Sequence, residues 1–458
     1  MFEKETIAAI STGITNSGIG IVRMSGKDAI NILEKIFVPH KDIEVNKIES
    51  HTVYYGNITD DGHIIDEVLV VVMRAPNTYT REDIVEIDCH GGVFVMKKIL
   101  DTVLKYGARI AEPGEFTKRA FLNGRIDLSQ AEAVSDIINS KSSLALDASI
   151  SQLRGNVKDA VKKLREKIIY HIAYIEAALD DPEHMSLENY SEELAVDVDI
   201  VINEIEKLIR TSENGKMISQ GIKTVILGKP NAGKSSLMNA LLGEDRAIVT
   251  SIAGTTRDTL EESLRLSELS LNIIDTAGIR QTDDIVEKIG VNKAKDIAKD
   301  ADLVIYVVDA SVPLDENDKD IIKIISDKKY IVLLNKTDLE CIVKSEDIEK
   351  ETGVIPVMIS AKNNTGLDEF EKKVRDMFYD GKIELNDELY ITNLRHKEAL
   401  SESLESLKLV KESIDNDMPE DFFSIDLMNA YEVLGRIIGE SVEDDLVNEI
   451  FSKFCMGK

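Results

Sequence analysis

The sequence has few cysteines and no long apolar segment. Only three of its 458 residues are cysteines, Cys89, Cys341 and Cys455. Three cysteines cannot form a disulfide framework and are typical of a reducing compartment. No run of about 18 apolar residues occurs, so we expect no membrane-spanning helix. Residues 1–6 are charged and lack the apolar core of a signal peptide. These absences predict a cytoplasmic protein.

Basic residues are scarce relative to acidic ones. The chain has 55 Lys and Arg against 84 Asp and Glu, a formal net charge of −29. Because affinity for a phosphate backbone comes mainly from Lys and Arg, this balance disfavours a simple nucleic-acid binder. A local basic patch or a partner would have to supply any such contact. The 43% of hydrophobic residues are enough for the cores of two or three domains.

The first part of the chain, to about residue 120, has the pattern of a small α+β domain. Short β-type runs alternate with helix-like stretches and charged or glycine-rich turns, which favours a ferredoxin-like split βαβ arrangement. The expected strands are 6–11, 18–24, 51–58, 68–73 and 84–89, and the expected helices are 28–37 and 93–106.

Helical periodicity occurs on both sides of a central segment. Apolar residues recur at spacings of three and four, which places them on one helix face. This pattern predicts one helical domain with a segment inserted into it; two separate helical pieces are the alternative. The stripes are Leu164, Ile168, Ile172, Ile175 and Leu179; Leu400, Leu404, Leu407, Val410 and Ile414; and Leu427, Tyr431, Leu434 and Ile438.

The central segment, from about residue 216 to 382, alternates apolar runs with helical patterns. Continuous apolar runs of this kind favour a mostly parallel sheet covered on both faces. The runs are 224–227, 271–274, 303–308, 331–334 and 355–359.

The stretch 228–236 is the strongest motif in the chain. It fills the pattern G-x-x-x-x-G-K-[ST] at Gly228, Gly233, Lys234 and Ser235, between an apolar run and a helix-like run. A strand, a glycine-rich turn and a helix start together direct N–H groups at one point, where a polyphosphate can bind. We expect Lys234 to contact the β and γ phosphates and Ser235 to bind Mg²⁺.

Four shorter motifs follow in the order that a guanine-nucleotide site requires. Residues 254–258 supply Thr256 as a second Mg²⁺ contact, and 275–278 place Asp275 and the N–H of Gly278 near Mg²⁺ and the γ-phosphate. Two further motifs, 335–338 and 360–362, would form the base pocket. We therefore expect these GTP-binding residues: Asn231, Ala232, Gly233, Lys234, Ser235, Ser236, Thr250, Ser251, Ile252, Ala253, Gly254, Thr255, Thr256, Asp275, Thr276, Ala277, Gly278, Asn335, Lys336, Asp338, Ser360, Ala361 and Lys362.

Asp338 predicts guanine specificity. Its carboxylate can accept hydrogen bonds from the guanine N1–H and exocyclic amine, a pair that adenine does not offer. We therefore expect GTP rather than ATP as the substrate.

The usual water-positioning glutamine is missing. In Ras-like enzymes it follows Asp-x-x-Gly, but here that position is Ile279. An aliphatic side chain cannot orient water. The candidates for this role are Arg257, Arg280, Glu287 and a cation near the phosphates. For each of the three side chains, an exposed charge without a catalytic role is the alternative.

With these motifs, the chain resembles the MnmE (TrmE) family of tRNA-modification GTPases over essentially its whole length. The terminal Cys-x-Gly-Lys and the Pro-Gly-Glu-Phe block are the most specific segments. The matching segments are Thr6-Ile-Ala-Ala-Ile, Gly18-Ile-Gly-Ile-Val-Arg, Glu82-Asp-Ile-Val-Glu-Ile-Asp-Cys-His-Gly-Gly, Pro113-Gly-Glu-Phe-Thr-Lys-Arg-Ala-Phe-Leu-Asn-Gly-Arg, Asp127-Leu-Ser-Gln-Ala-Glu-Ala and Phe454-Cys-Met-Gly-Lys.

The resemblance implies a multidomain α/β and α architecture. A folate-binding and dimerising α+β domain would span 1–120. A discontinuous helical domain would span 121–215 and 383–458. A Ras-like P-loop G domain with a mostly parallel sheet would be inserted at 216–382.

The resemblance also implies a reaction and a partner. With the FAD-containing MnmG, in a heterotetramer or larger complex, the homodimer would install an aminomethyl or carboxymethylaminomethyl group at C5 of a tRNA wobble uridine. The one-carbon unit would come from 5,10-methylene- or 5-formyl-tetrahydrofolate. Arg23, Glu86, Arg125 and Lys458 would contact the folate, and Cys455 would lie close to it.

The resemblance further implies how hydrolysis proceeds without the glutamine. K⁺ would bind to Asn231, Thr250, Ile252 and Thr255 and neutralise phosphate charge, as an arginine finger does. Glu287 would orient water, alongside the catalytic Lys234. The G domains would pair across their switches to complete the site.

Two places in the chain depart from the family pattern. The segment 179–184 and Ser251 differ from the usual residues.

Two other functions are alternatives to tRNA modification. An Era- or Der-like ribosome-assembly GTPase shares the phosphate loop but is expected to carry an RNA-binding module, often basic, in place of an acidic helical domain. A folate-binding scaffold with a regulatory G domain is a non-enzymatic alternative.

Overall fold

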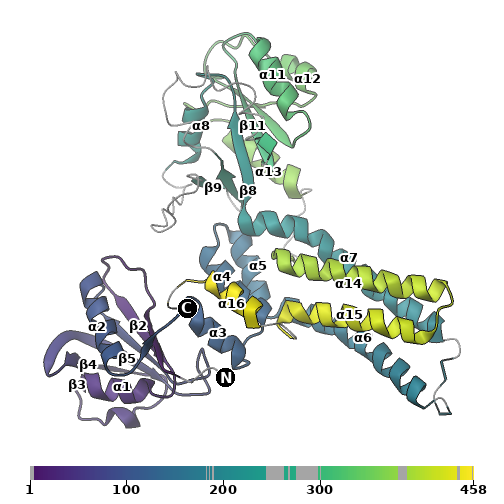
Figure 1. Cartoon of the computed structure of the whole chain (residues 1–458). Coiled ribbons are helices and arrows are strands. Elements are labelled where there is room, and N and C mark those ends of the chain that lie inside the picture. Colours follow the sequence, from purple (N-terminus) through teal and green to yellow (C-terminus); the bar gives the residue numbers. More distant parts are fainter. Residues whose placement is uncertain are drawn as a thin grey trace. The chain divides into compact units, whose positions relative to one another are not determined.

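The computed structural model describes residues 5–181, 183–184, 186–187, 190–243, 262–266, 269–274, 298–299, 301–379, 389–440, 444–455 and 457. The chain forms two compact units. The first comprises residues 1–135, 152–180 and 424–458, and the second comprises 136–151 and 181–423. Each unit is described by itself (Figure 1).

The first unit contains a seven-stranded sheet in the order β3-β4-β5-β6-β2-β1-β7. Its strands are β1 (Ile7–Ile10), β2 (Gly20–Ser25), β3 (Phe37–Pro39), β4 (Thr52–Asp60), β5 (His63–Met73), β6 (Ile84–Cys89) and β7 (Arg109–Ile110). Helices α1 (Ala29–Ile36) and α2 (Val93–Lys105) and a short 3-10 turn (Val45–Lys47) complete the domain. Alternate strand residues and both helices share one buried core. The side chains between them in the strands therefore point to the opposite face of the sheet.

The sheet is wider than the ferredoxin-like arrangement expected from the sequence. The series β2, α1, β5, β6, α2, β7 has the β-α-β-β-α-β order of that arrangement. However, β1 lies between β2 and β7, and β3 and β4 extend the other edge. The sequence pattern locates strands but does not specify which strands pair, so these additions could not be read from it.

Helices complete the first unit. They are α3 (Glu115–Leu122), most of α4 (Leu128–Asn139), α6 (Asn156–Asp180), most of α15 (Glu420–Ile438) and α16 (Asp444–Ser452). Four residues of the predicted α6 stripe are buried, Leu164, Ile168, Ile172 and Ile175, whereas Leu179 at the helix end is 50% exposed. The α15 stripe likewise buries Leu427, Leu434 and Ile438.

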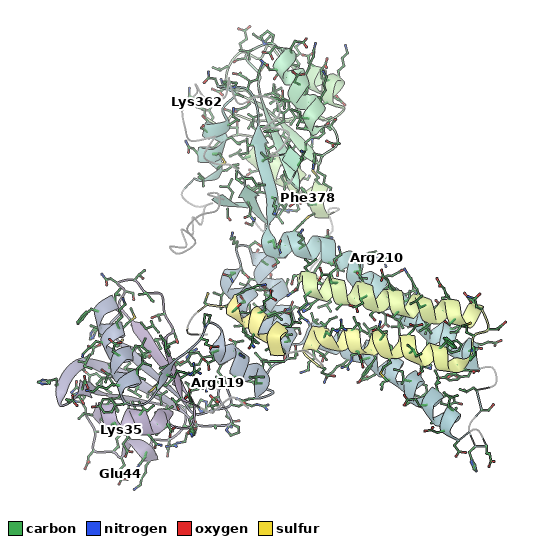
Figure 2. All side chains as sticks on the ribbon, in the orientation of Figure 1. Lys35, Glu44, Arg119, Arg210, Lys362 and Phe378 are labelled. Carbon is green, nitrogen blue, oxygen red and sulfur yellow. The ribbon has the colours of Figure 1, made fainter. Side chains whose placement is uncertain are left out.

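A buried ion network joins α3 to the sheet domain. Arg119, labelled in Figure 2, pairs with Glu82 and Glu115, both at 2.9 Å. Arg109 pairs with the same Glu115 at 2.7 Å, and the N–H of Glu112 donates to it at 2.8 Å. Glu115 is 7% exposed. Hydrogen bonds from Arg109, Arg119 and the N–H of Glu112 therefore compensate the burial of this carboxylate.

The second unit contains a six-stranded sheet in the order β13-β12-β11-β8-β10-β9. Its strands are β8 (Ile222–Leu227), β9 (Glu262–Leu266), β10 (Leu269–Ile273), β11 (Leu303–Asp309), β12 (Tyr330–Asn335) and β13 (Val357–Met358). All neighbouring pairs are parallel except β9 with β10. Separate buried clusters lie on the two faces of this sheet. The prediction of a mostly parallel sheet covered on both faces is confirmed.

Seven helices of the second unit lie wholly or mostly in the described residues. Six of them are α5 (Ser143–Leu153), α7 (Tyr190–Gln220), α8 (Lys234–Leu241), α11 (Glu316–Ile325), α12 (Ser345–Thr352) and α13 (Leu367–Tyr379). The seventh, the long helix α14 (Leu394–Asp415), packs along α7. Lys411 of α14 pairs with Asp199 of α7 at 2.5 Å. Within the described part of the chain, no helix is both long and apolar enough to span a membrane.

The network around Glu115 generates a pH-dependent stability prediction. Burial alone raises the pKa of Glu115, but hydrogen bonds from Arg109, the Glu112 N–H and Arg119 outweigh it and lower this pKa overall. Its stabilisation is therefore complete above the unfolded pKa of about 4.3 and is lost as the pH falls through the lower folded pKa. Glu115→Gln should reduce the free energy of unfolding at pH 7 by about 1–3 kcal/mol.

The difference between Glu115→Gln and the natural protein should shrink as the pH falls below about 4.3 and through the lower folded pKa of Glu115, where its carboxyl group becomes protonated. Denaturant unfolding at several pH values measures it. Glu44→Gln is the matched control, because the Glu44–Lys47 pair is exposed. A difference that stays constant down to pH 3 would contradict the ionised role of Glu115.

Candidate active site

The phosphate loop connects β8 to α8, as the motif predicts. Gly233 has φ of +96°, a left-handed conformation that favours glycine. A Cβ at this position would lie 2.2 Å from Asn335 Nδ2. Asn231 is also left-handed, at φ +61°. The loop therefore requires glycine at Gly233 for both conformation and space.

Lys234 is held by the loop itself. Its Nζ donates to the carbonyl oxygens of Gly228 at 2.9 Å and Lys229 at 2.7 Å. The side chain thus lies over the loop, where the motif predicts the β and γ phosphates. Ser235 and Ser236 follow in the first turn of α8 and are exposed.

Asn335 connects the phosphate loop to the predicted base pocket. Its Nδ2 donates to the carbonyl of Ala232 at 2.9 Å, and its Oδ1 accepts from the N–H of Ala361 at 3.1 Å. Asn335 is 2% exposed. One buried carboxamide therefore fixes three segments that are far apart in the sequence.

Asp338 is oriented at the mouth of this pocket. Its Oδ1 accepts from the Ser360 hydroxyl at 2.6 Å. This hydrogen bond, more than the nearby charges of Lys362 and Lys336, lowers the pKa of the exposed Asp338. An ionised carboxylate is the acceptor that the guanine N1–H and amine require. Lys336, at φ +66°, pairs with Asp309 at 2.5 Å.

Many predicted residues of the nucleotide site lie outside the described residues. The structure describes the predicted residues of the phosphate loop and those of the base pocket, which include Lys362 (Figure 2). Of the predicted metal ligands, it describes Ser235 for Mg²⁺ and Asn231 for K⁺. The members outside it are Thr250, Ser251, Ile252, Ala253, Gly254, Thr255, Thr256, Asp275, Thr276, Ala277, Gly278 and Glu287, together with Arg257, Ile279 and Arg280.

The described ligands, Ser235 and Asn231, have side chains that suit metal ions. Ser235 offers a hydroxyl at the helix start, which suits Mg²⁺ that takes its other ligands from phosphate and water. The Asn231 side chain is exposed, so its carbonyl oxygen is accessible to a cation. Among the described residues, no group of three His, Cys, Asp or Glu side chains could hold a metal by itself.

A second constellation lies in the first unit, on the sheet face opposite to the core that contains α1 and α2. Arg23 of β2 and Glu86 of β6 are register partners, and Arg23 Nε lies 2.7 Å from Glu86 Oε1. Both side chains are 20% exposed. Arg23 Nη1 also donates to the carbonyl of Gly457 at 3.4 Å.

The C-terminal tail, described here by Cys455 and Gly457, contacts this site within the same chain. The Gly457 carbonyl accepts from the Ser11 hydroxyl at 3.0 Å, and the N–H of Gly114 donates to the Cys455 carbonyl at 3.3 Å. Gly457 has φ of +85°, and a Cβ there would lie 2.4 Å from the carbonyl of Ile10. Gly457 is therefore held close to β1 and Arg23, and the exposed Cys455 lies two residues before it. Lys458 lies outside the described residues.

Arg125 borders the same region through Tyr79. Its guanidinium lies 4.7 Å from the Tyr79 ring centroid. Burial raises the pKa of Tyr79, while the charges of Arg125 and Arg23 oppose that rise. Tyr79 therefore lies near both arginines. The structure brings Arg23, Glu86, Arg125 and the tail into one region of the first unit.

Two features of these sites escaped the sequence reasoning. Lys229 occupies a variable position of the phosphate loop, and its ion pair with Asp318 has no sequence signature. Asp88 follows Glu86 on the same strand face, and its buried Oδ1 has no hydrogen-bond partner among the described atoms. Residues two apart on a strand share a face, so the position of Asp88 beside Glu86 could have been predicted from the sequence. Burial, and then the charge of Glu86, raise its pKa.

Comparisons with known proteins agree with this architecture. A family model described as MnmE helical domain matches residues 128–455, and one described as GTP-binding protein TrmE N-terminus matches 6–125. The tRNA modification GTPase MnmE of Lachnoclostridium phytofermentans is 60% identical over 455 residues, with 99% of each chain covered. That of Thermoanaerobacter pseudethanolicus is 48% identical over 458 residues, again with 99% of each covered.

The chain belongs to the MnmE family of tRNA modification GTPases. A solved G domain of the T. maritima FeoB iron transporter is also similar, with 28% identity, a TM-score of 0.26, and coverage of 34% of this chain and 98% of that chain. As a member of the MnmE family, the protein is a GTP hydrolase that acts in tRNA modification.

The base pocket generates a prediction for this MnmE chain. Asp338→Asn replaces a carboxylate acceptor with an amide that can donate to the 2-oxo group of xanthine. The ratio of kcat/KM for GTP to that for XTP should fall by at least about a hundredfold. Steady-state hydrolysis with each nucleotide measures it. Glu340→Gln, a neighbouring exposed change of the same type, is the control. An unchanged ratio would remove Asp338 from the pocket.

Proposed function

We propose that this chain is a K⁺-stimulated GTPase that works with an FAD-dependent partner of the MnmG type. The pair installs aminomethyl or carboxymethylaminomethyl groups at C5 of tRNA wobble uridines. The one-carbon donor is 5,10-methylene- or 5-formyl-tetrahydrofolate. The observation that carries the proposal is the docking of Gly457 beside the Arg23–Glu86 pair in a chain that also has a GTPase loop.

The first unit supports the donor part of the proposal. A folate offers hydrogen-bond donors on its pterin and carboxylates on its glutamate. Glu86 is an acceptor, while Arg23 and Arg125 are cations of the kind that bind carboxylates. Cys455 is exposed and its carbonyl is fixed by Gly114. Together with Lys458, these residues form the proposed folate site.

The loop geometry supports the cation part. Asn231 holds a left-handed conformation at the loop tip, and its exposed side chain can offer one oxygen to K⁺. The remaining ligands are proposed to be Thr250, Ile252 and Thr255, and Glu287 is proposed to orient water. When bound, the cation would neutralise charge that develops on the phosphates. Three of the proposed K⁺ ligands, Thr250, Ile252 and Thr255, belong to the first switch segment. We therefore also propose that the G domains of a homodimer pair across their switches during hydrolysis.

The domain division follows the proposed roles. Residues 1–120 bind folate and dimerise, residues 216–382 bind and hydrolyse GTP, and the helical segments 121–215 and 383–458 connect them. An acidic chain of net charge −29 leaves much of the tRNA contact to the partner.

The proposal is tested by the tRNA nucleosides of cells that lack the protein. Loss of C5-modified wobble uridines is the expected result. Intact modification with defective ribosome assembly would instead favour the Era- or Der-like function.

The cation site generates a prediction in vitro. GTP hydrolysis should be faster in KCl than in NaCl at equal ionic strength, with a specific activity that rises with protein concentration. Asn231→Ala should abolish the K⁺ stimulation and leave nucleotide affinity nearly unchanged. Asn231→Gly is the matched variant, because glycine keeps the left-handed conformation without strain. Stimulation that persists in Asn231→Gly would exclude this residue as a ligand.

The docked tail generates a second prediction. Deletion of residues 455–458 should leave GTP hydrolysis unchanged, because the phosphate loop lies in the other unit. Binding of 5-formyl-tetrahydrofolate and tRNA modification should both be lost, because the deletion removes Gly457 from Arg23. Calorimetric titration and nucleoside analysis measure these outcomes. Full modification by the truncated protein would overturn the assignment of the tail.

A further inference from the structure

Asp318 is a buried carboxylate next to the phosphate loop. It lies in the first turn of α11 and is 1% exposed. Its Oδ2 lies 2.6 Å from Lys229 Nζ and accepts from the N–H of Asp315 at 2.9 Å. Its Oδ1 accepts from the Tyr306 hydroxyl at 2.7 Å. A carboxylate at this depth requires such compensation, and Lys229 supplies the positive charge.

The partners of Asp318 are rigidly placed. Tyr306 is fully buried in β11, in register with Leu227 at the end of β8. Burial and the hydrogen bond to Asp318 raise the pKa of Tyr306, so its hydroxyl remains a donor. Asp315 caps α11 through a reciprocal bond with Asp318. The acceptor for Lys229 is therefore fixed by a strand and a helix start.

Lys229 links this fixed acceptor to the catalytic lysine. Its side chain is 15% exposed and also reaches Asp315 at 3.1 Å. Its carbonyl accepts from Lys234 Nζ at 2.7 Å and from the N–H of Ala232 at 3.3 Å. The side chain of Lys229 thus contacts α11, while its carbonyl oxygen accepts a hydrogen bond from Lys234, the predicted phosphate ligand.

We propose that Lys229 and Asp318 are positioning residues for GTP hydrolysis: their buried ion pair holds the phosphate loop in the conformation that binds the nucleotide. Lys229 acts through the loop backbone and Lys234, without contact to the phosphates. Burial lowers the pKa of Lys229, but the hydrogen bonds to Asp318 and Asp315 outweigh it and raise this pKa overall. The Lys229 ammonium group therefore stays charged at neutral pH.

The test compares Lys229→Met with Asp318→Asn. Both break the ion pair, but only Asp318→Asn keeps the positive charge in the loop. Both should weaken GDP and GTP binding by about tenfold to hundredfold, because a small displacement of the loop misplaces Lys234. KM should rise more than kcat falls. Titration with a fluorescent guanine nucleotide gives the affinities, and steady-state hydrolysis gives KM and kcat.

Three further variants complete the experiment. Lys229→Arg should retain most of the affinity, because it restores the charge. The double variant Lys229→Met with Asp318→Asn should be no weaker than the single variants, because they remove the same pair. Lys319→Met is the matched control, since it breaks the exposed Lys319–Glu316 pair on the same helix and should leave affinity unchanged.

Two results would overturn the proposal. If Asp318→Asn binds GTP as well as or better than the natural protein while Lys229→Met is weakened, Lys229 contacts the phosphates directly. If both variants bind normally at a temperature where circular dichroism shows them folded, the pair contributes only stability. Asp318→Asn keeps the size of the side chain, so it provides the readout even if Lys229→Met fails to fold.

Discussion

The nucleotide site depends on one buried side-chain amide. Asn335 joins the carbonyl of Ala232 in the phosphate loop to the N–H of Ala361 in the base pocket. It reaches the loop because Gly233 has no side chain to block it. The phosphate loop and the predicted base pocket are therefore held in a single frame, and the ion pair of Lys229 with Asp318 contacts the same loop from the side of α11.

The first unit is organised by charge pairs on the sheet face opposite to α1 and α2. Arg23 and Glu86 are register partners across β2 and β6, so their separation follows from strand pairing. The pairs Arg119–Glu82 and Arg109–Glu115 then fix α3 against the sheet domain. The same helix begins beside Gly114, which binds the tail. The ion pairs that place α3 thereby also place Gly114, which holds the carbonyl of Cys455.

Sequence reasoning was most informative where function depends on neighbouring residues. The phosphate loop follows a short motif whose geometry is local, and Asp338 and Ser360 each lie in a short motif of the base pocket. Strand pairing and ion pairs between residues far apart in the sequence could not be predicted from it. The place of β1 between β2 and β7 depends on register, and the partner of Lys229 lies on a distant helix. The role of Arg23 and Glu86 entered through family resemblance, since their residue types alone fit an ordinary surface.

The docking of Gly457 on Ser11 also has a consequence for biosynthesis. The two residues are separated by 446 positions, so the contact closes a loop that contains both the helices and the GTPase sheet. During translation, the sheet domain emerges and can fold long before its last contact exists. The site around Arg23 is therefore completed only after residue 457 has left the ribosome. Nascent chains that stall earlier would carry a finished GTPase sheet beside an unfinished site.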